Sequence, residues 1–442
     1  MAYRNLVGFE LNDASLSAEL GGVNGTASIQ TTVKHGGARA LRCNPTTTAT
    51  GYADIPLSFD AQGRGIATVT DCYYGFAFRY ATKPASGSEE IGRFHTGGKQ
   101  LRINSSGVLE LWDNTPTLHA TGSAVLAVDT WYWITVRIHE AGDTQTIRVN
   151  GVTDISGTLL NTGPSSSFQL GKVANRNSQT VDFFFDDAVV DDAGYPPEGI
   201  VLLSVPIGAG EAAGWTNGTG STFAEVDDVP NDGDTTYIQA SATQDNLNST
   251  FDMQTSSTIG ISTTIRAVKS TIFARSGSIS GTSAARLRTL SGGVARELTA
   301  FEWGVSYVAL AAVDSTDPNG GGAWTTTKFD ALEVGAAADA IAQVQRFTAA
   351  YLLAFCDVPV SAPSGTGAGT FGALTGAATG VMQPSGVGAG TFASLTGAAT
   401  GAQSQNGTGA GSFASLVGSA TGTQGAAGPS IPVVFHHRQR NQ

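Results

Sequence analysis

The chain has 442 residues, of which 57 are glycine and only 14% are charged. This length predicts two or three domains, and little charge together with many Thr, Val, Ile and Phe favours an all-β protein rich in turns. The formal net charge of −12 argues against binding to nucleic acid or to an anionic membrane surface, because both attract clustered Lys and Arg.

Residues 1–195 carry the alternating pattern of antiparallel strands. In Trp131–Gly151, WYWITVRIHEAGDTQTIRVNG, apolar and polar residues alternate on both sides of a short polar loop, which predicts a β-hairpin with one buried face. Similar strand patterns recur in four further stretches: 75–80, 101–113, 168–170 and 181–190. We therefore expect a two-sheet antiparallel sandwich or jelly roll.

Five segments of this region resemble a laminin-G or concanavalin-A-like domain of the kind found in bacteriophage structural proteins. They are GFE (8–10), SIQTTVKHGGARALRC (28–43), WYWITVRI (131–138), IRVNG (147–151) and FFFDDAVVDDAG (183–194). The resemblance covers residues 5–195. It implies a β-sandwich and a structural place in a virion.

A linker is expected at 196–199, because Pro196 and Pro197 cannot continue a strand ladder. Residues 200–358 then predict a second sandwich. Its patterns include an alternating strand at 259–266, a hairpin at 286–298 and one short helix at 336–343. The segments around Trp215 and WTTTKFDALEVG resemble a second module that accompanies such domains in phage virion proteins.

Residues 359–430 form a Gly-rich repeat region, with no charged residue from 361 to 430 and three copies at a period of 21. One unit offers only a Phe and a Leu and cannot form its own core. Two outcomes stay open: a flexible linker, or packing against copies from neighbouring chains. Fixed spacing favours the second, with these self-association residues: Phe371, Leu374, Phe392, Leu395, Phe413 and Leu416.

The tail, 431–442, holds the basic cluster HHRQR. It is either a solvated terminus or an anchor peptide that docks on an acidic partner.

No motif identifies a reaction. A retaining glycosidase on such a sandwich needs two carboxyls about 5 Å apart. The acids of the stretch 182–192 lack that arrangement, since Phe184 lies between Asp182 and Asp186 and the strand has no Glu. Asp186 and Asp187 are the candidate Ca²⁺ ligands, against the alternative of turn and capping carboxylates exposed to water. No other cofactor is expected.

Aromatic side chains are the remaining candidates for a ligand, because sugars present apolar C–H faces on which an indole can stack. The candidate carbohydrate contacts are Trp112, Trp131 and Trp133. The alternative for Trp133 is that it packs under a loop or against another chain.

Three widely spaced cysteines without a CxxC pair predict buried thiols in a protein made in a reducing cytoplasm. The first residues lack the apolar segment of a signal peptide, and no run of about 18 apolar residues predicts a membrane span.

The expected function is a non-enzymatic component of a phage particle: a tail- or head-associated fibre or decoration protein on the virion exterior. Its partners would be copies of itself, with a homotrimer favoured, other virion proteins and host glycans. The alternatives are a secreted polysaccharide-binding lectin or adhesin, and a glycan hydrolase on the concanavalin-like fold.

Overall fold

The computed structural model describes most of residues 3–359 and nine short strands of the repeats. The described ranges are 3–11, 20, 22–57, 71–94, 99–113, 117–139, 144–158, 167–217, 223–228, 233, 235–240, 248–276, 283–298, 301–338, 344–359 and, within 370–421, the strands named below. Residues 1–358 and 359–442 form two separate compact units. The basic tail lies outside the described residues.

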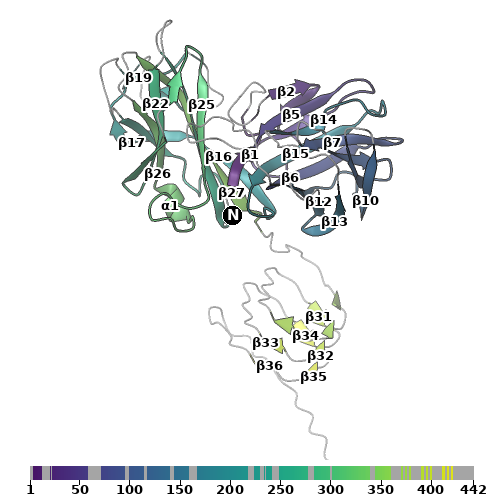
Figure 1. The fold of residues 1–442 in the computed structure, drawn as a ribbon. Helices are drawn as coiled ribbons and strands as arrows, with labels where there is room; N and C mark the ends of the chain where they lie inside the picture. The colour runs from purple at the N-terminus through teal and green to yellow at the C-terminus, as the bar shows by residue number, and fades with distance from the viewer. Residues whose placement is uncertain are drawn as a thin grey trace, which may run out of the picture. The chain divides into compact units, whose positions relative to one another are not determined.

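The first sandwich consists of two antiparallel sheets built from residues 3–191 (Figure 1). The eight-stranded sheet has the order β13 (Val152–Thr158), β12 (Thr144–Val149), β11 (Tyr132–His139), β6 (Asp71–Thr82), β15 (Asp182–Asp191), β4 (Ala40–Cys43), β3 (Ala27–Gln30), with β1 (Tyr3–Val7) beside β15. The seven-stranded sheet has the order β10 (Leu118–Val125), β9 (Val108–Trp112), β8 (Lys99–Asn104), β7 (Ser88–Phe94), β14 (Ser167–Lys172), β5 (Gly51–Pro56), β2 (Gly22–Gly25).

The expected hairpin at 131–151 forms as β11 and β12 and lies within the eight-stranded sheet. Its apolar residues Ile134, Val136 and Ile138 are buried in the core between the two sheets, as the alternation predicts. The next turn, Asn150-Gly151, joins β12 to β13 with two positive φ angles, 49° and 80°. Such a two-residue turn matches the right-handed twist of the strands it connects.

The second sandwich follows with two six-stranded antiparallel sheets. The β27 sheet contains β18 (Thr216–Asn217), β19 (Ile238–Ala240), β27 (Gln345–Asp357), β21 (Ile265–Ser276), β25 (Val308–Asp314) and β16 (Gly199–Ser204). The β26 sheet contains β17 (Pro206–Ala213), β20 (Asn248–Met253), β26 (Leu332–Ala338), β22 (Ser283–Ser291), β23 (Val294–Glu297) and β24 (Phe301–Trp303). The short helices are η1 (Phe223–Glu225) and α1 (Thr326–Asp330).

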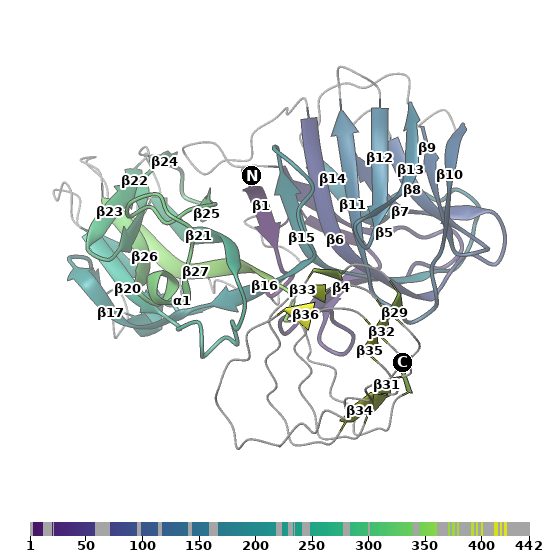
Figure 2. The ribbon, with the colours of Figure 1, turned by 90° about the horizontal axis from the view of Figure 1, so that it is seen from below.

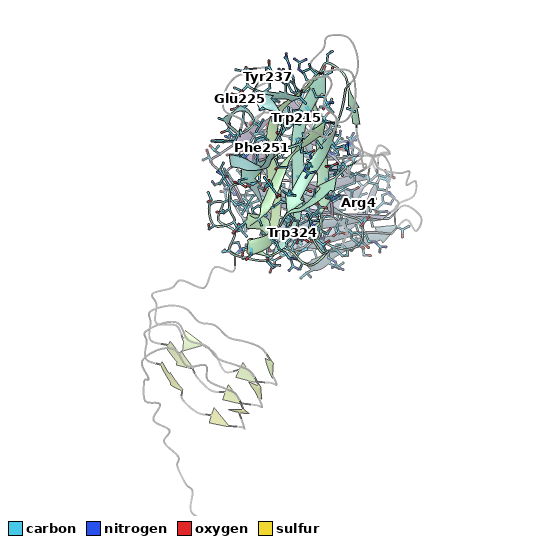
Figure 3. All side chains as sticks on the ribbon, turned by 90° about the vertical axis from the view of Figure 1, so that its left-hand side faces the viewer. Arg4, Trp215, Glu225, Tyr237, Phe251 and Trp324 are labelled. Carbon is cyan, nitrogen blue, oxygen red and sulfur yellow. The ribbon has the colours of Figure 1, made fainter. Side chains whose placement is uncertain are left out.

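Buried aromatic side chains fill this second core. Trp215 and Phe251 both contact the ring of Phe347, at centroid distances of 6.2 Å and 5.9 Å. Figure 3 shows Trp215 and Phe251 toward one end of the sandwich and Trp324, which belongs to the same core, toward the other.

Two sequence-based expectations for this sandwich are wrong. The strand expected at 259–266 begins only at Ile265, because residues 255–260 form a turn in which Ile259 N–H donates to the Thr255 carbonyl. The helix expected at 336–343 is wrong over 336–338, which end strand β26, and its remainder lies outside the described residues. Ala336–Ala338 pair with β22 and are buried, so packing between sheets overrides the helix propensity of alanine.

A third apolar cluster joins the two sandwiches. Trp133 and Val189 of the eight-stranded sheet are buried together with Val201, Leu353 and Phe355 of the β27 sheet. Strand β1 lies against β21, β25 and β27, and Figures 1 and 2 show β1 and β16 where the sandwiches meet. The two sandwiches therefore share a core and form one body.

The repeats form three small parallel sheets, each with one strand from every repeat. Their strands are β28 (Thr370–Phe371), β31 (Gly390–Phe392) and β34 (Gly411–Phe413); β29 (Leu374–Thr375), β32 (Leu395–Thr396) and β35 (Leu416–Val417); β30 (Ala378–Thr379), β33 (Ala399–Thr400) and β36 (Ala420–Thr421). Equivalent residues pair in register. The strand pairing runs between successive repeats of one chain, which is neither of the two arrangements considered from the sequence.

No helix among the described residues is long and apolar enough to cross a membrane. The all-β fold class, with antiparallel sandwiches before the repeats, is confirmed.

Candidate ligand-binding surfaces

Asp186 and Asp187 lie in an irregularity of β15, where the pairing with β6 shifts register between Asp186 and Val189. Asp187 has a positive φ of 52°. Both carboxylates are completely buried rather than exposed to water. Asp186 Oδ2 accepts the backbone N–H groups of His35 and Gly36 at 2.8 Å and 3.1 Å. The bulge thus turns both acids inward, where they hold the chain in place.

Asp187 binds the same turn and one further segment. Its Oδ2 lies 2.7 Å from His35 Nδ1, and its Oδ1 accepts the Val201 N–H at 2.6 Å. Asp187 therefore ties the 35–36 turn to the first strand of the second sandwich. Among the described residues, no group of three or more His, Cys, Asp or Glu is placed to hold a metal ion.

Burial and neighbouring charges act together on the pKa values of this cluster. Burial raises the pKa of Asp186 well above its usual range, and the neighbouring charge of Asp187 raises it further. For His35, burial opposes the protonated form, but the hydrogen bond and charge of Asp187, with Glu198 adding to them, leave its pKa above the usual value. Glu198 Oε1 is 3.6 Å from His35 Nε2, so the linker meets the cluster through this carboxylate.

Trp131 and Trp133 differ in their surroundings. Trp133 is only 2% exposed, belongs to the cluster between the sandwiches and donates from Nε1 to the Pro196 carbonyl at 3.2 Å. An open platform for a sugar is therefore wrong for Trp133, because the linker covers it. Trp131 is half-buried, and its ring meets the His35 ring edge-on at a centroid distance of 5.6 Å.

Trp112 lies elsewhere, at the end of β9 in the seven-stranded sheet. Its half-buried ring is covered by the Arg102 guanidinium, whose Cζ lies 4.2 Å from the ring centroid. Its Nε1 donates to Glu110 Oε2 at 2.8 Å. The structure does not bring Trp112 together with the other two tryptophans, because Trp133 lies on β11 in the other sheet and Trp131 directly precedes that strand.

Around Trp112, a polar face covers the side of the seven-stranded sheet that is turned away from the core. Gln100 and Arg102 alternate along β8 with the core residues Leu101 and Ile103, so they lie on this opposite face. Arg102 Nε donates to Gln100 Oε1 at 2.9 Å, while Gln100 Nε2 is buried without a hydrogen-bond partner. Burial lowers the pKa of Arg102 from its usual value, and the charge of Glu90 opposes that shift.

Glu90 on β7 extends the polar face. It is fully buried and accepts from Arg93 Nη2 and Arg176 Nε, both at 2.9 Å. Sequence reasoning missed these residues, because a strand with charges on one face is typical of any solvated sheet. The alternation of Gln100 and Arg102 with apolar residues does indicate a polar face. It does not indicate that these side chains are buried, because their burial depends on long neighbouring side chains.

A cleft of about 260 Å³ lies beside the linker, on the outer side of the eight-stranded sheet. Its lining residues come from β11, the turn after β12 and the linker: Trp133, Thr135, Arg148, Asn150, Gly151, Tyr195, Pro196, Pro197 and Glu198. Gly75 on the neighbouring strand leaves room for the linker and for Trp133. A Cβ at that position would lie 2.7 Å from both Pro196 Cγ and Trp133 Cζ2.

The phenylalanines and leucines predicted for self-association are in the repeat sheets. Phe371 pairs in register with Phe392, which pairs with Phe413. Leu374, Leu395 and Leu416 follow the same pattern in the second sheet. Their association with other chains stays a prediction.

No family model and no curated protein matches this chain. Solved structures that match part of this chain include cellulose induced protein Cip1, 15% identical, over 44% of this chain and 93% of that one, with a TM-score of 0.31. Domain 4 of AbnA, an extracellular arabinanase of Geobacillus stearothermophilus in complex with arabinotriose, is 15% identical over 44% and 95%, with a TM-score of 0.30. Trypanosoma rangeli sialidase in complex with sialic acid is 11% identical over 43% and 31%, with a TM-score of 0.31. At these scores the similarity carries no information on the fold or the activity of this chain.

Proposed function

We propose that this chain is a non-enzymatic structural component on the exterior of a bacteriophage particle, tail- or head-associated. The observation that carries the proposal is the shared core of Trp133, Val189, Val201, Leu353 and Phe355. It turns two sandwiches into one body, and the same chain continues into strand-stacking repeats. The phage resemblance of residues 5–195 supports the placement in a virion.

The hydrogen bonds of Asp186 and Asp187 support the proposal that the protein is not an enzyme. Asp186 and Asp187 accept hydrogen bonds from His35, Gly36 and Val201, so their oxygens hold the fold together. General acid–base chemistry would instead need a carboxyl within hydrogen-bond reach of a substrate.

Assembly with further copies is supported by the repeats. In each of the three parallel sheets the outer strands belong to the first and the third repeat, for instance β28 and β34. An edge strand offers unpaired N–H and C=O groups along one side, which is a template for another chain. A homotrimer of chains joined through the repeats remains the favoured assembly.

The proposal is tested by mass spectrometry of purified particles from a lysate in which this chain is expressed. We expect its peptides to stay with the particles through a density gradient at a constant ratio to the major capsid protein. A chain found only among the soluble proteins at the top of the gradient contradicts the virion role and favours the secreted lectin or adhesin.

Binding of host polysaccharide is a second candidate function, favoured by the polar face. Trp112 offers part of an indole ring, and the buried Gln100 Nε2 next to it lacks a hydrogen-bond partner. A glycan array with assembled protein tests this idea. Binding that is lost in Trp112→Ala but kept in Trp131→Ala supports it, and an array without signal above background refutes it.

A further inference from the structure

The cleft beside the linker combines an apolar wall with a polar one. Pro197 supplies the half-exposed apolar side, and the buried residues Trp133 and Pro196 lie beside it. Thr135 and Arg148 come from adjacent strands and supply the polar side. A wall of each kind suits a sugar ring, which has an apolar C–H face and a rim of hydroxyl groups.

Two polar atoms of this cleft lack partners. Thr135 Oγ1 and Arg148 Nε are both buried without a hydrogen bond, and Thr135 is only 2% exposed. Buried polar atoms in native proteins are nearly always hydrogen-bonded, and each exception calls for an explanation such as a missing ligand. Two exceptions on residues that line one cleft point to a ligand with hydrogen-bonding groups.

Arg148 also lacks a counter-ion. Its guanidinium stacks on the Tyr195 ring, with Cζ 3.5 Å from the centroid, and within the described part of the chain no carboxylate forms an ion pair with it. Glu198 lines the same cleft, but it lies 3.6 Å from His35 Nε2. The planar edge of a guanidinium matches a carboxylate, which can accept two parallel hydrogen bonds from it.

The size of the cleft limits the ligand. Its volume of about 260 Å³ is just below the range of roughly 300–1,000 Å³ that is usual for small-molecule sites. It therefore suits one sugar residue rather than a stretch of polysaccharide. The Tyr195 ring meets the Tyr73 ring edge-on at a centroid distance of 4.9 Å. This contact fixes the ring on which Arg148 stacks and so keeps Arg148 in position for the sugar.

We propose that this cleft binds a single carboxylate-bearing sugar residue, such as the terminal uronate of a glycan. The carboxylate pairs with Arg148, a hydroxyl of the ring bonds to Thr135 Oγ1, and the apolar face of the ring packs against Pro197. This site lies on the opposite sheet from Trp112, and it requires only the folded chain, so it does not rest on the virion role.

Ligand-observed NMR and calorimetry with the full-length chain test the proposal, using sodium glucuronate as the probe and glucose and acetate as comparisons. We expect saturable binding of glucuronate in the millimolar range, and binding at least tenfold weaker for glucose and acetate. Equal affinity for all three overturns the proposed recognition. So does an absence of glucuronate binding up to about 50 mM, well above the millimolar dissociation constant expected for one sugar contact.

Three variants assign the binding to the cleft. Arg148→Gln should weaken glucuronate binding at least tenfold, and Thr135→Val should weaken it severalfold without lowering the melting temperature, because the lost hydroxyl has no partner in the protein. Arg42→Gln is the matched control: Arg42 lies on β4 of the same sheet, its Nε is 2.8 Å from Asp182 Oδ1, and it does not line the cleft, so binding should stay within twofold of wild type. Unchanged binding in both Arg148→Gln and Thr135→Val overturns the assignment.

Discussion

The Lys172 side chain is fully buried at the edge of the first core. Its Nζ donates to the carbonyls of Gln179 at 2.8 Å and Thr47 at 3.2 Å, and lies 3.4 Å from Glu89 Oε1. Glu89 in turn accepts the backbone N–H groups of Asn177 and Gln179, both at 3.1 Å. This pair fixes two loops against the end of strand β14.

We predict that Lys172→Met lowers the free energy of unfolding by about 3–5 kcal/mol, because it leaves the buried carboxylate of Glu89 without its cation. Urea unfolding followed by fluorescence measures this. Arg4→Gln is the control, since Arg4 is 40% exposed in its ion pair with Asp192 and its loss should cost less than about 1 kcal/mol. Equal effects of the two variants would contradict this interpretation of Lys172.

The raised pKa of His35 predicts that the stability of the protein depends on pH. A raised pKa in the folded state means that the stabilisation from the imidazolium is complete below the unfolded value of about 6.5, and is lost as the pH rises through the folded pKa. We therefore expect the unfolding free energy of the wild type to fall as the pH rises above about 6.5. Thermal unfolding at a series of pH values should show a smaller decline in His35→Gln. Parallel curves for the two proteins would refute the role of His35.

The three cysteines are buried thiols. Cys43, Cys72 and Cys356 are buried and free, as their spacing predicts, and burial raises the pKa of Cys356 to about 12. At neutral pH this thiol is therefore protonated and unreactive.

The linker packs against the eight-stranded sheet at Gly75, where the absence of a side chain leaves room for Pro196. We predict that Gly75→Ala lowers the unfolding free energy by about 1–3 kcal/mol, since its Cβ would clash with Pro196 and Trp133. Thermal unfolding measures this change. Gly194→Ala, where a Cβ meets nothing within 4 Å, is the control and should have little effect. A Gly75→Ala protein as stable as wild type would mean that the linker is not packed there.

The alternation of apolar residues predicted the hairpin of β11 and β12 and the inward face of β11, but it misplaced the strand expected at 259–266. It could not predict what lies against the outward face of β11, because the pattern is the same whether Trp133 is exposed to solvent or covered by the linker. The bulge at Asp186 and Asp187 also escaped prediction, since it depends on the pairing of β15 with β6 rather than on composition. The repeats were expected to pack against neighbouring chains, whereas their strands pair between successive repeats of one chain, because identical segments can pair either way.

In the molecule as a whole, a buried apolar cluster joins the two sandwiches. Tyr3 of β1 meets Phe355 of β27 edge-on at 5.4 Å, and Lys269 Nζ donates to Asn5 Oδ1 at 2.9 Å across the same contact. These contacts bury apolar area between the sandwiches, which favours cooperative unfolding.

We predict a single calorimetric transition for the two sandwiches in the full-length wild type. Leu353→Asp should split it in two, because a charge without a partner is costly in a buried apolar contact. Leu118→Asp on β10, where the leucine is 44% exposed, is the matched control and should leave one transition. Two transitions in the wild type would show that the sandwiches unfold independently.

Electron microscopy of intact particles, labelled with an antibody raised against this chain, tests the virion role most directly. We predict label at a fixed position on the outside of the particle, on the head surface or along the tail, and its loss when the gene for the chain is deleted. Particles that stay unlabelled, while the same antibody detects the chain free in the lysate, would contradict a role in the virion.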